Sequence, residues 1–212
     1  MQEKLLAIYQ RLYDHFGPQQ WWPGETPFEV MIGAVLTQNT NWSNVEKAID
    51  NLKRAGVLSH EKMASLPAGL LAEYIRPAGY YNIKAARLAN LFVLIRERYE
   101  GSVEQMLEAE TEELRQTLLS VRGIGPETAD SILLYAARRP VFVVDAYTYR
   151  ILSRHDLIGE DVTYDELQRF FMDNIPPDTA LYNEFHALLV CAAKDYCKKT
   201  NPRCSVCPLE GV

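Results

Sequence analysis

The sequence VRGIGPETADSILLYAARRPVFVVDAYTYR, residues 121–150, predicts a helix end, a tight glycine turn, a second helix and an apolar run that delivers one carboxylate. Gly123 and Gly125 flank Ile124, so the turn can adopt positive φ and present backbone N–H groups with no side chain in front of them. Pro126 stands where the first residue of a helix is expected, since its missing N–H would have no intrahelical partner there. The free amides of such a helix start form a natural seat for phosphate.

The residues around this turn make the pattern more specific than a pair of glycines. A GxG sequence alone favours an ordinary turn between two helices. Here the segment ETA, residues 127–129, follows Pro126, and Asp145 comes later on an apolar stem. Because short motifs gain meaning from such a context, the whole frame favours a functional hairpin.

This frame resembles the helix-hairpin-helix DNA glycosylases of the endonuclease III superfamily, the HhH-GPD proteins. The resemblance implies that the hairpin grips the DNA backbone and that Asp145, at the place of the family's aspartate, is catalytic. The hairpin residues that it implies in DNA binding are Gly123, Ile124, Gly125 and Thr128. Aspartate is also favoured as a helix N-cap, and Asp145 can fill both roles at once.

Glu127 departs from the lyase members of that family, in which a lysine follows the hairpin. A lysine amine can attack the sugar C1′ and form a Schiff base that leads to strand cleavage, whereas a carboxylate cannot. The sequence therefore predicts a monofunctional glycosylase, unless another lysine reaches the site.

Length and composition limit the class of protein. The 212 residues suffice for one large domain or two small lobes, and 48% of them are hydrophobic, which is ample for a core. The first sixteen residues read as an amphipathic helix that carries Glu3 and Asp14, unlike a signal or transit peptide. No apolar run approaches the roughly 20 residues that a membrane helix needs. We therefore expect an intracellular, cytoplasmic protein without a membrane, associated with the nucleoid in a bacterium.

The charges are unevenly distributed. A net charge of −6 argues against a nonspecific nucleic-acid binder, because such proteins usually have a basic footprint. Acidic residues gather between Glu97 and Glu113, which we interpret as a solvated helical face, whereas Lys194, Lys198, Lys199 and Arg203 gather near the C-terminus. One basic face would suit DNA held on one side only.

Helical spacing of apolar residues, such as Leu5, Ile8 and Leu12, predicts an all-α fold. The short VFVVDA run is interpreted as a turn into a helix. The family resemblance implies two lobes. Residues 19–125 would form a six-helix barrel that ends in the hairpin, and residues 1–18 and 126–212 a second lobe with the catalytic aspartate and a cysteine loop. The active site would lie in a cleft between the lobes of a monomer.

The three tryptophans, Trp21, Trp22 and Trp42, are candidates for a base pocket. Core packing is the better interpretation of any single tryptophan. Together with LTQNTNW, however, they resemble the endonuclease III-related branch that includes 3-methyladenine DNA glycosylases, in which aromatic residues at these places sandwich the flipped base. An alkylated purine carries positive charge, so it stacks well on electron-rich rings and leaves the sugar easily.

Four polar residues are further candidates for DNA contact. Gln38 and Asn39 lie where family members insert a polar side chain into the gap left by the flipped base, and the sequence does not say which of them does so. Asn82 and Lys84 match another family stretch near DNA, although a solvated helix start explains them almost as well.

Cys197, Cys204 and Cys207 have the spacing C-x6-C-x2-C. In the family a fourth cysteine follows after five residues, and the set holds a [4Fe-4S] cluster through four thiolates. Here the sequence ends at Val212, one residue short of that position, so truncation, recruitment of Cys191 or loss of the cluster are all open. We expect a cluster in the natural protein, with zinc as the alternative metal and Cys191 as a buried small side chain.

The sequence thus predicts a base-excision repair glycosylase that acts on double-stranded DNA with a damaged base. It would flip the base and hydrolyse its N-glycosidic bond, with an alkylated purine as the preferred substrate. The enzymatic alternative is an oxidised-pyrimidine glycosylase with AP lyase activity, and the non-enzymatic alternative is a helix-hairpin-helix module that only binds DNA.

Overall fold

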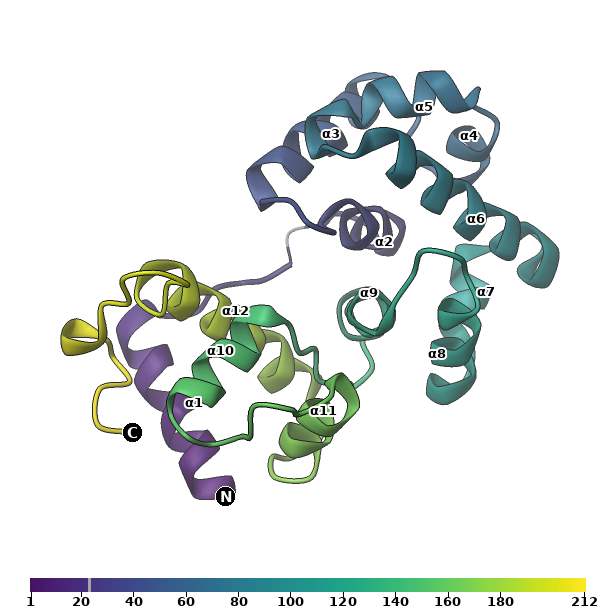
Figure 1. Ribbon diagram of the computed structural model, residues 1–212. Helices are drawn as coiled ribbons and strands as arrows, with labels where there is room; N and C mark the ends of the chain where they lie inside the picture. Colours follow the sequence, from purple (N-terminus) through teal and green to yellow (C-terminus); the bar gives the residue numbers. More distant parts are fainter. Residues whose placement is uncertain (23) are drawn as a thin grey trace. The chain divides into compact units, whose positions relative to one another are not determined.

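The computed structural model describes residues 1–22 and 24–212, and within them every regular element is helical (Figure 1). The all-α prediction is confirmed. The contacts divide the chain into two compact units, Pro23–Arg139 and the combination of Met1–Trp22 with Pro140–Val212. None of the described helices is long and apolar enough to cross a membrane.

The unit Pro23–Arg139, called the central unit below, contains eight α-helices among its described residues, with a 3-10 turn and a final π turn. They are α2 (Pro27–Leu36), α3 (Trp42–Arg54), α4 (His60–Ala64), α5 (Ala68–Tyr74), η1 (Arg76–Ala78), α6 (Tyr81–Tyr99), α7 (Val103–Glu108), α8 (Thr111–Leu119), α9 (Pro126–Ser131) and η2 (Ile132–Ala136).

The other unit, called the terminal unit, combines the first helix with the last part of the chain. Its elements are α1 (Gln2–Phe16), α10 (Ala146–Arg154), α11 (Tyr164–Met172), α12 (Thr179–Asp195) and the short turn η3 (Cys204–Val206).

Helix α2 is the core of the central unit. Every residue from Phe28 to Leu36 is buried, as expected for a helix that is apolar on all sides. It starts at Thr26, whose side chain accepts the N–H of Glu29, and Pro27 occupies the first helical position, where proline is favoured. Helices α3, α6 and α9 and the turn η2 pack around it.

An aromatic cluster and two helix contacts hold the terminal unit together. The rings of Phe142 and Phe171 stack with centroids 4.0 Å apart, and Phe185 meets both edge-on. Helix α12 packs against α1 and α10, and α1 turns its buried Leu5 and Ile8 inward. The aromatic pairs add specific geometry to the burial of large apolar surfaces.

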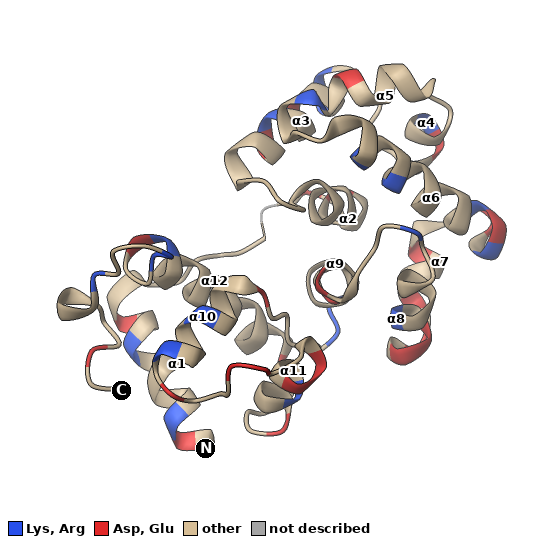
Figure 2. Cartoon of the chain, viewed as in Figure 1, with Lys and Arg blue, Asp and Glu red and all other residues tan. Residues whose placement is uncertain are grey.

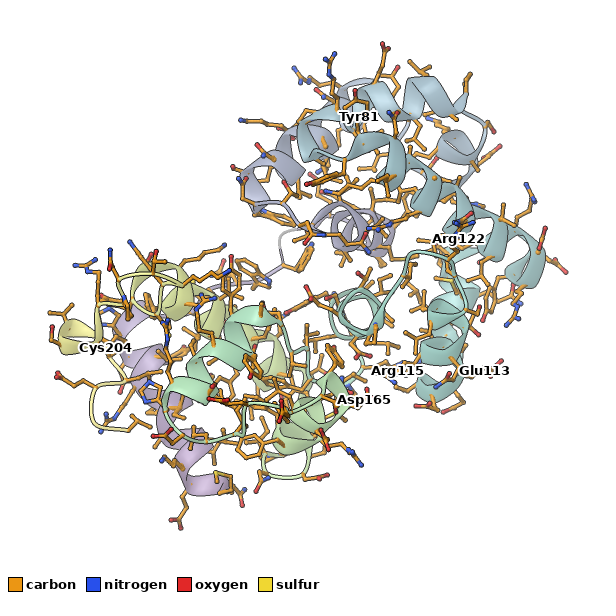
Figure 3. All side chains as sticks on the ribbon, viewed as in Figure 1. Tyr81, Glu113, Arg115, Arg122, Asp165 and Cys204 are labelled. Carbon is orange, nitrogen blue, oxygen red and sulfur yellow. The ribbon has the colours of Figure 1, made fainter. Side chains whose placement is uncertain are left out.

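The hairpin helix α9 belongs to the central unit, because α9 and η2 pack against α2 and α8. Arg115 on α8, labelled in Figure 3, clamps the buried carboxylate of Asp130 through two hydrogen bonds of 2.7 and 3.1 Å. The division expected from the sequence put residues 126–139 with the other lobe. The observed boundary follows the packing and falls after Arg139.

Exposed carboxylates lie along the end of α6 and on α7 and α8, where Figure 2 shows them in red. All the glutamates from Glu97 to Glu113 are exposed, consistent with a solvated acidic face. The four basic residues near the C-terminus, Lys194, Lys198, Lys199 and Arg203, are exposed as well.

Lys84 lies inside the central unit and not on its surface. Its side chain is among the largest that are fully buried, and the residue is 1% exposed. The Nζ atom donates to the carbonyl oxygens of Leu36 and Ala78 at 2.8 and 2.7 Å, tying the end of α2 to η1. Burial, with a smaller effect of the nearby Arg87, lowers the pKa of Lys84 to about 8. This placement does not fit the DNA contact, or the solvated helix start, expected for Lys84.

Replacing Lys84 by methionine removes both hydrogen bonds but keeps an unbranched side chain in the buried position. We therefore expect the free energy of unfolding to fall by about 1–3 kcal/mol. Lys62→Met is the matched control, because Lys62 is exposed and donates to one carbonyl, that of Gly56. Urea denaturation of the three proteins measures the difference. Equal losses in both variants would contradict the structural role.

The lowered pKa adds a pH signature to this comparison. The folded protein releases the Lys84 proton near pH 8, before the unfolded chain does near 10.5. Since the unfolded state then binds more protons, stability rises with pH in that window. The wild type should therefore gain stability relative to Lys84→Met between these values, and parallel curves would contradict the shift.

Candidate active site

The hairpin between α8 and α9 adopts the expected positive φ at one of its two glycines. Gly123 has φ 98°, whereas Gly125 has φ −99° and forms the N-cap of α9. A Cβ on Gly123 would lie 2.5 Å from Cγ of Arg87, so a side chain at this position would force the side chain of Arg87 to move. Ile124 is buried and anchors the turn. Gly125, the N-cap of α9, has no side chain that could accept an amide of the first turn, and anions often bind at helix starts of this kind.

The side chain of Gln38 links the segment after α2 to this hairpin. Its Nε2 donates to the carbonyl of Gly123 at 3.1 Å and to Oγ1 of Thr128 at 2.9 Å, and its Oε1 accepts from Arg87. Both ends of the amide are therefore engaged. Thr128 is buried, with its hydroxyl held by Gln38, so its side chain serves the hairpin from the inside.

Asn39 and Asn82 are exposed, unlike Lys84. Asn39 has φ 53°, a left-handed conformation that asparagine tolerates well. Asn82 lies in the first turn of α6, on the rim of an apolar cavity of about 320 Å³ between α5 and α6. Both side chains are therefore available at the surface of the central unit.

Two hairpin supports were missed in the sequence. Arg87 fixes Gln38, and Nδ2 of Asn90 donates to the carbonyl of Arg122 at 2.9 Å. Arg122, labelled in Figure 3, lies on the loop that leads into α9. Both supports come from α6, and no local pattern in that helix distinguishes them from solvated side chains.

Asp145 is the N-cap of α10. Its Oδ1 accepts the N–H of Thr148 at 2.7 Å and the hydroxyl of Thr148 at 2.9 Å. This confirms the N-cap interpretation of Asp145, whose catalytic role stays a prediction. The carboxylate is nearly buried, with 11% of the side chain exposed.

His186, on α12, is the second partner of this carboxylate and was not singled out in the sequence. Its Nε2 lies 3.6 Å from Oδ2 of Asp145. Burial by itself raises the pKa of Asp145, but the contacts with His186 and the hydrogen bonds from Thr148 outweigh it and hold the pKa below its usual value. Asp145 is therefore an ionised carboxylate in a largely buried setting.

The three tryptophans are half-buried and divide between the units. Trp21 and Trp22 belong to the terminal unit, where their rings meet edge-on with centroids 6.2 Å apart and Nζ of Lys194 lies 5.8 Å from the Trp21 ring. Trp42 belongs to the central unit and donates its indole N–H to Glu46 at 2.8 Å. The ring of Trp21 thus already accepts a cation.

Cys197, Cys204 and Cys207 line one cavity of about 190 Å³ in the terminal unit. Cys197 is buried, Cys204 is exposed on η3 (Figure 3), and Cys207 is half-buried. Nη1 of Arg154 donates to Sγ of Cys197 at 3.3 Å. Among the described residues, no three His, Cys, Asp or Glu side chains are already arranged to hold a metal ion.

Cys191 is not part of that cavity wall. It lies on α12, where its thiol donates to Oε1 of Gln19 at 3.1 Å. Burial raises the pKa of this thiol, which makes thiolate formation harder. Cys191 is half-buried and not fully buried as expected, and its hydrogen bond to Gln19 fits a metal ligand poorly.

The Gln38 contacts predict a stability effect on the central unit. Gln38→Ala leaves the carbonyl of Gly123 and the guanidinium of Arg87 without this partner, so we expect unfolding to become easier by about 1–3 kcal/mol. Asn39→Gly is the matched control, because glycine accepts the same left-handed backbone. Chemical denaturation gives the comparison. A Gln38→Ala protein as stable as the control would show that the amide is not structural.

Comparison with known proteins agrees with this architecture. The sequence profile of the HhH-GPD superfamily base excision DNA repair proteins matches residues 32–177. The chain is 48% identical over 210 residues to MJ1434 of Methanocaldococcus jannaschii, which is named as a DNA repair glycosylase, and the alignment covers 98% of this chain and 94% of that protein.

Two solved structures share the fold. The first is H. pylori 3-methyladenine DNA glycosylase (MagIII) bound to 1,N6-ethenoadenine, with a TM-score of 0.78 and 36% identity over 91% of this chain and 96% of that one. The second, a trapped endonuclease III–DNA covalent intermediate, has a TM-score of 0.83 at 22% identity over 99% and 93%. The prediction from the hairpin frame is confirmed, and the chain belongs to the HhH-GPD superfamily of base excision DNA repair proteins as a DNA N-glycosylase.

Proposed function

We propose that the chain is a monofunctional DNA glycosylase that releases alkylated purines, such as 3-methyladenine, from double-stranded DNA. The observation that carries the proposal is Asp145, an ionised and largely buried carboxylate fixed at the start of α10. The similarity to the H. pylori 3-methyladenine DNA glycosylase supports the substrate class. The enzyme would act inside the cell as a monomer.

The proposed reaction uses Asp145 for charge and not for covalent attack. As the bond between C1′ and the base nitrogen breaks, its electron pair leaves with the base and positive charge develops on the sugar. A fixed carboxylate stabilises such charge most where water is largely excluded. Water then adds to C1′ and loses one proton. Oδ1 of Asp145 is occupied by Thr148, so Oδ2 is the oxygen that can take part.

The positive charge of an alkylated purine before its bond to the sugar breaks explains the aromatic candidates. An alkylated purine departs as a neutral molecule and needs little acid catalysis, so recognition can rest on stacking. Trp21, Trp22 and Trp42 are the proposed stacking residues. Nζ of Lys194 lies 5.8 Å from the centroid of the Trp21 ring. This contact supports the interpretation, because it shows a positive charge held at that ring.

The hairpin would hold the DNA backbone. The glycine N-cap of α9 and the side-chain-free Gly123 suit a phosphate. Asn39 would fill the gap left by the flipped base more readily than Gln38, because Gln38 would first have to break its hydrogen bonds to the hairpin. Exposed Asn82 remains a proposed DNA contact.

The substrate assay compares duplex DNA carrying methylated purines with DNA carrying oxidised pyrimidines, each developed with and without alkali. We expect free 3-methyladenine, strand breaks only after alkali and no borohydride-trapped adduct, because Glu127 offers no amine for a Schiff base. Asp145→Asn should abolish base release and keep DNA affinity, while Glu127→Gln should keep base release. Breaks without alkali on oxidised DNA would establish the endonuclease III-type lyase instead. DNA binding without release of any base would favour the binding module.

We further propose that Cys197, Cys204 and Cys207 supply three of the four thiolates that a [4Fe-4S] cluster takes. Their thiols share one cavity, and Arg154 donates to the sulfur of Cys197; hydrogen bonds to ligand sulfurs are a common feature of such sites. When bound, the cluster would act structurally. Tying residues 197–207 together would hold Lys198, Lys199 and Arg203 in place for phosphates.

Iron and sulfide analysis of protein purified without oxygen tests this second proposal. Cys204→Ser should lose the iron and its visible absorption, because a hydroxyl is a poor ligand for such a cluster. Cys191→Ser is the matched control and should keep both, since Cys191 bonds to Gln19. Stoichiometric zinc in the absence of sulfide would indicate a zinc site and not an iron-sulfur cluster. The absence of both iron and zinc would overturn the proposal.

A further inference from the structure

Gln19 is a half-buried polar residue that lies shortly before the adjacent tryptophans of the terminal unit. Its Nε2 donates to the carbonyl oxygens of Phe16 and Gly17 at 3.2 and 2.9 Å. Both carbonyls lie at the end of α1, where a helix leaves such groups without intrahelical partners. This end of the amide therefore caps α1, which by itself is a structural role.

The other polar groups of Gln19 bond to α12. The backbone N–H donates to Oε1 of Glu184 at 2.6 Å, and Oε1 of Gln19 accepts the thiol of Cys191 at 3.1 Å. Burial raises the pKa of this thiol, so it stays protonated at neutral pH and can donate. Glu184 and Cys191 are seven residues apart on α12 and therefore lie on the same face of the helix. Gln19 thus joins the end of α1 to that face.

A bend in the backbone follows directly. Gln20 has φ 51°, a left-handed conformation that is uncommon in residues other than glycine. Because Gln20 is exposed, burial of its own side chain does not hold this bend, and the bonded Gln19 supplies the anchor. Trp21 then meets α12 again, since Nζ of Lys194 lies 5.8 Å from the centroid of its ring. The ring of Trp22 meets that of Trp21 edge-on.

We infer that Gln19 is a positioning residue, which clamps residues 19–22 to α12 and so sets the orientation of Trp21 and Trp22 for a flipped base. This inference rests on the proposed function, in which these rings stack on an alkylated purine. The attraction between a ring and a cation depends on the cation lying over the ring face, so a ring that turns away loses it. Gln19 needs no contact with DNA for this role.

The bond from Cys191 separates this role from a simple helix cap. A cap of α1 needs only the bonds from Nε2 to the two carbonyls. The thiol of Cys191 reaches the opposite end of the amide, and it comes from the helix that also carries Lys194 to the Trp21 ring. Removing the thiol therefore weakens the clamp on α12 and leaves the cap of α1 in place.

Inhibition of base release by free 3-methyladenine tests the inference. Gln19→Met keeps the length of the side chain but loses the hydrogen bonds of the amide. We expect the inhibition constant of the free base to rise about tenfold, because stacking on one aromatic ring contributes about that much to the binding of a base. The affinity for undamaged duplex DNA should stay the same. Gln10→Met is the matched control and should change neither value, because Gln10 bonds only to Asp14 on the exposed side of α1.

Acrylamide quenching of tryptophan fluorescence gives a second measurement that does not depend on activity. In a Trp42→Phe background, Trp21 and Trp22 are the remaining tryptophans. Their quenching should become stronger in Gln19→Met, because the segment that carries them is held less firmly, and should be unchanged in Gln10→Met.

Two substitutions of Cys191 keep the test decisive if Gln19→Met does not fold. Cys191→Ala removes the donor to Oε1 of Gln19, so the inhibition constant should rise about threefold, as expected for the loss of one hydrogen bond, and quenching should increase. Cys191→Ser keeps a donor in the form of a hydroxyl and should behave like the wild type.

An inhibition constant equal to that of the wild type in Gln19→Met and Cys191→Ala, or unchanged quenching in both, would overturn the inference. Failure of the proposed function looks different, because the wild type itself would then release no methylated purine. The quenching comparison would in that case still decide whether Gln19 positions the two tryptophans.

Discussion

The hydrogen bond from the Thr148 N–H to Asp145 is the contact on which the candidate site depends. It caps α10 and fixes the carboxylate with the same two atoms. A helix N-terminus also favours negative charge, so the fold stabilises the ionised form that the proposed reaction requires. Helix stability and chemistry therefore depend on one side chain, and a substitution that weakens the cap also changes the site.

In the central unit, the hairpin likewise depends on a few linked side-chain contacts. A side chain at Gly123 would displace Arg87, which holds the amide of Gln38. Gln38 then bonds back to the carbonyl of Gly123. The turn that would meet phosphate is thus braced from α6 and from the segment after α2. This bracing leaves the amides of α9 pre-organised, which lowers the cost of ordering them on a ligand.

Local patterns predicted the features that depend on neighbouring residues along the chain. The all-α fold, the positive φ of Gly123 and the cap at Asp145 are of this kind. Features that depend on packing between distant segments could not be predicted from the local sequence. The apolar Ile83 is 53% exposed and the charged Lys84 is 1% exposed, the opposite of what their polarity predicts. Lys84 can be buried because two carbonyl groups from other segments accept hydrogen bonds from its ammonium group. His186 is buried for a similar reason, since its partner lies on α10.

Glu127 links the proposed absence of a lyase step to the stability of α9. The residue lies in the first turn of that helix and is exposed, where a carboxylate is favoured and a lysine is opposed by the helix dipole. A lyase lysine at this place would therefore carry a cost in stability that the glutamate avoids. In the proposed DNA complex, this negative charge would leave the phosphate to the backbone amides and not to a side chain at this position. The residue that would deny the proposed reaction an amine thus suits the helix, and DNA binding at the hairpin would depend on the geometry of the turn.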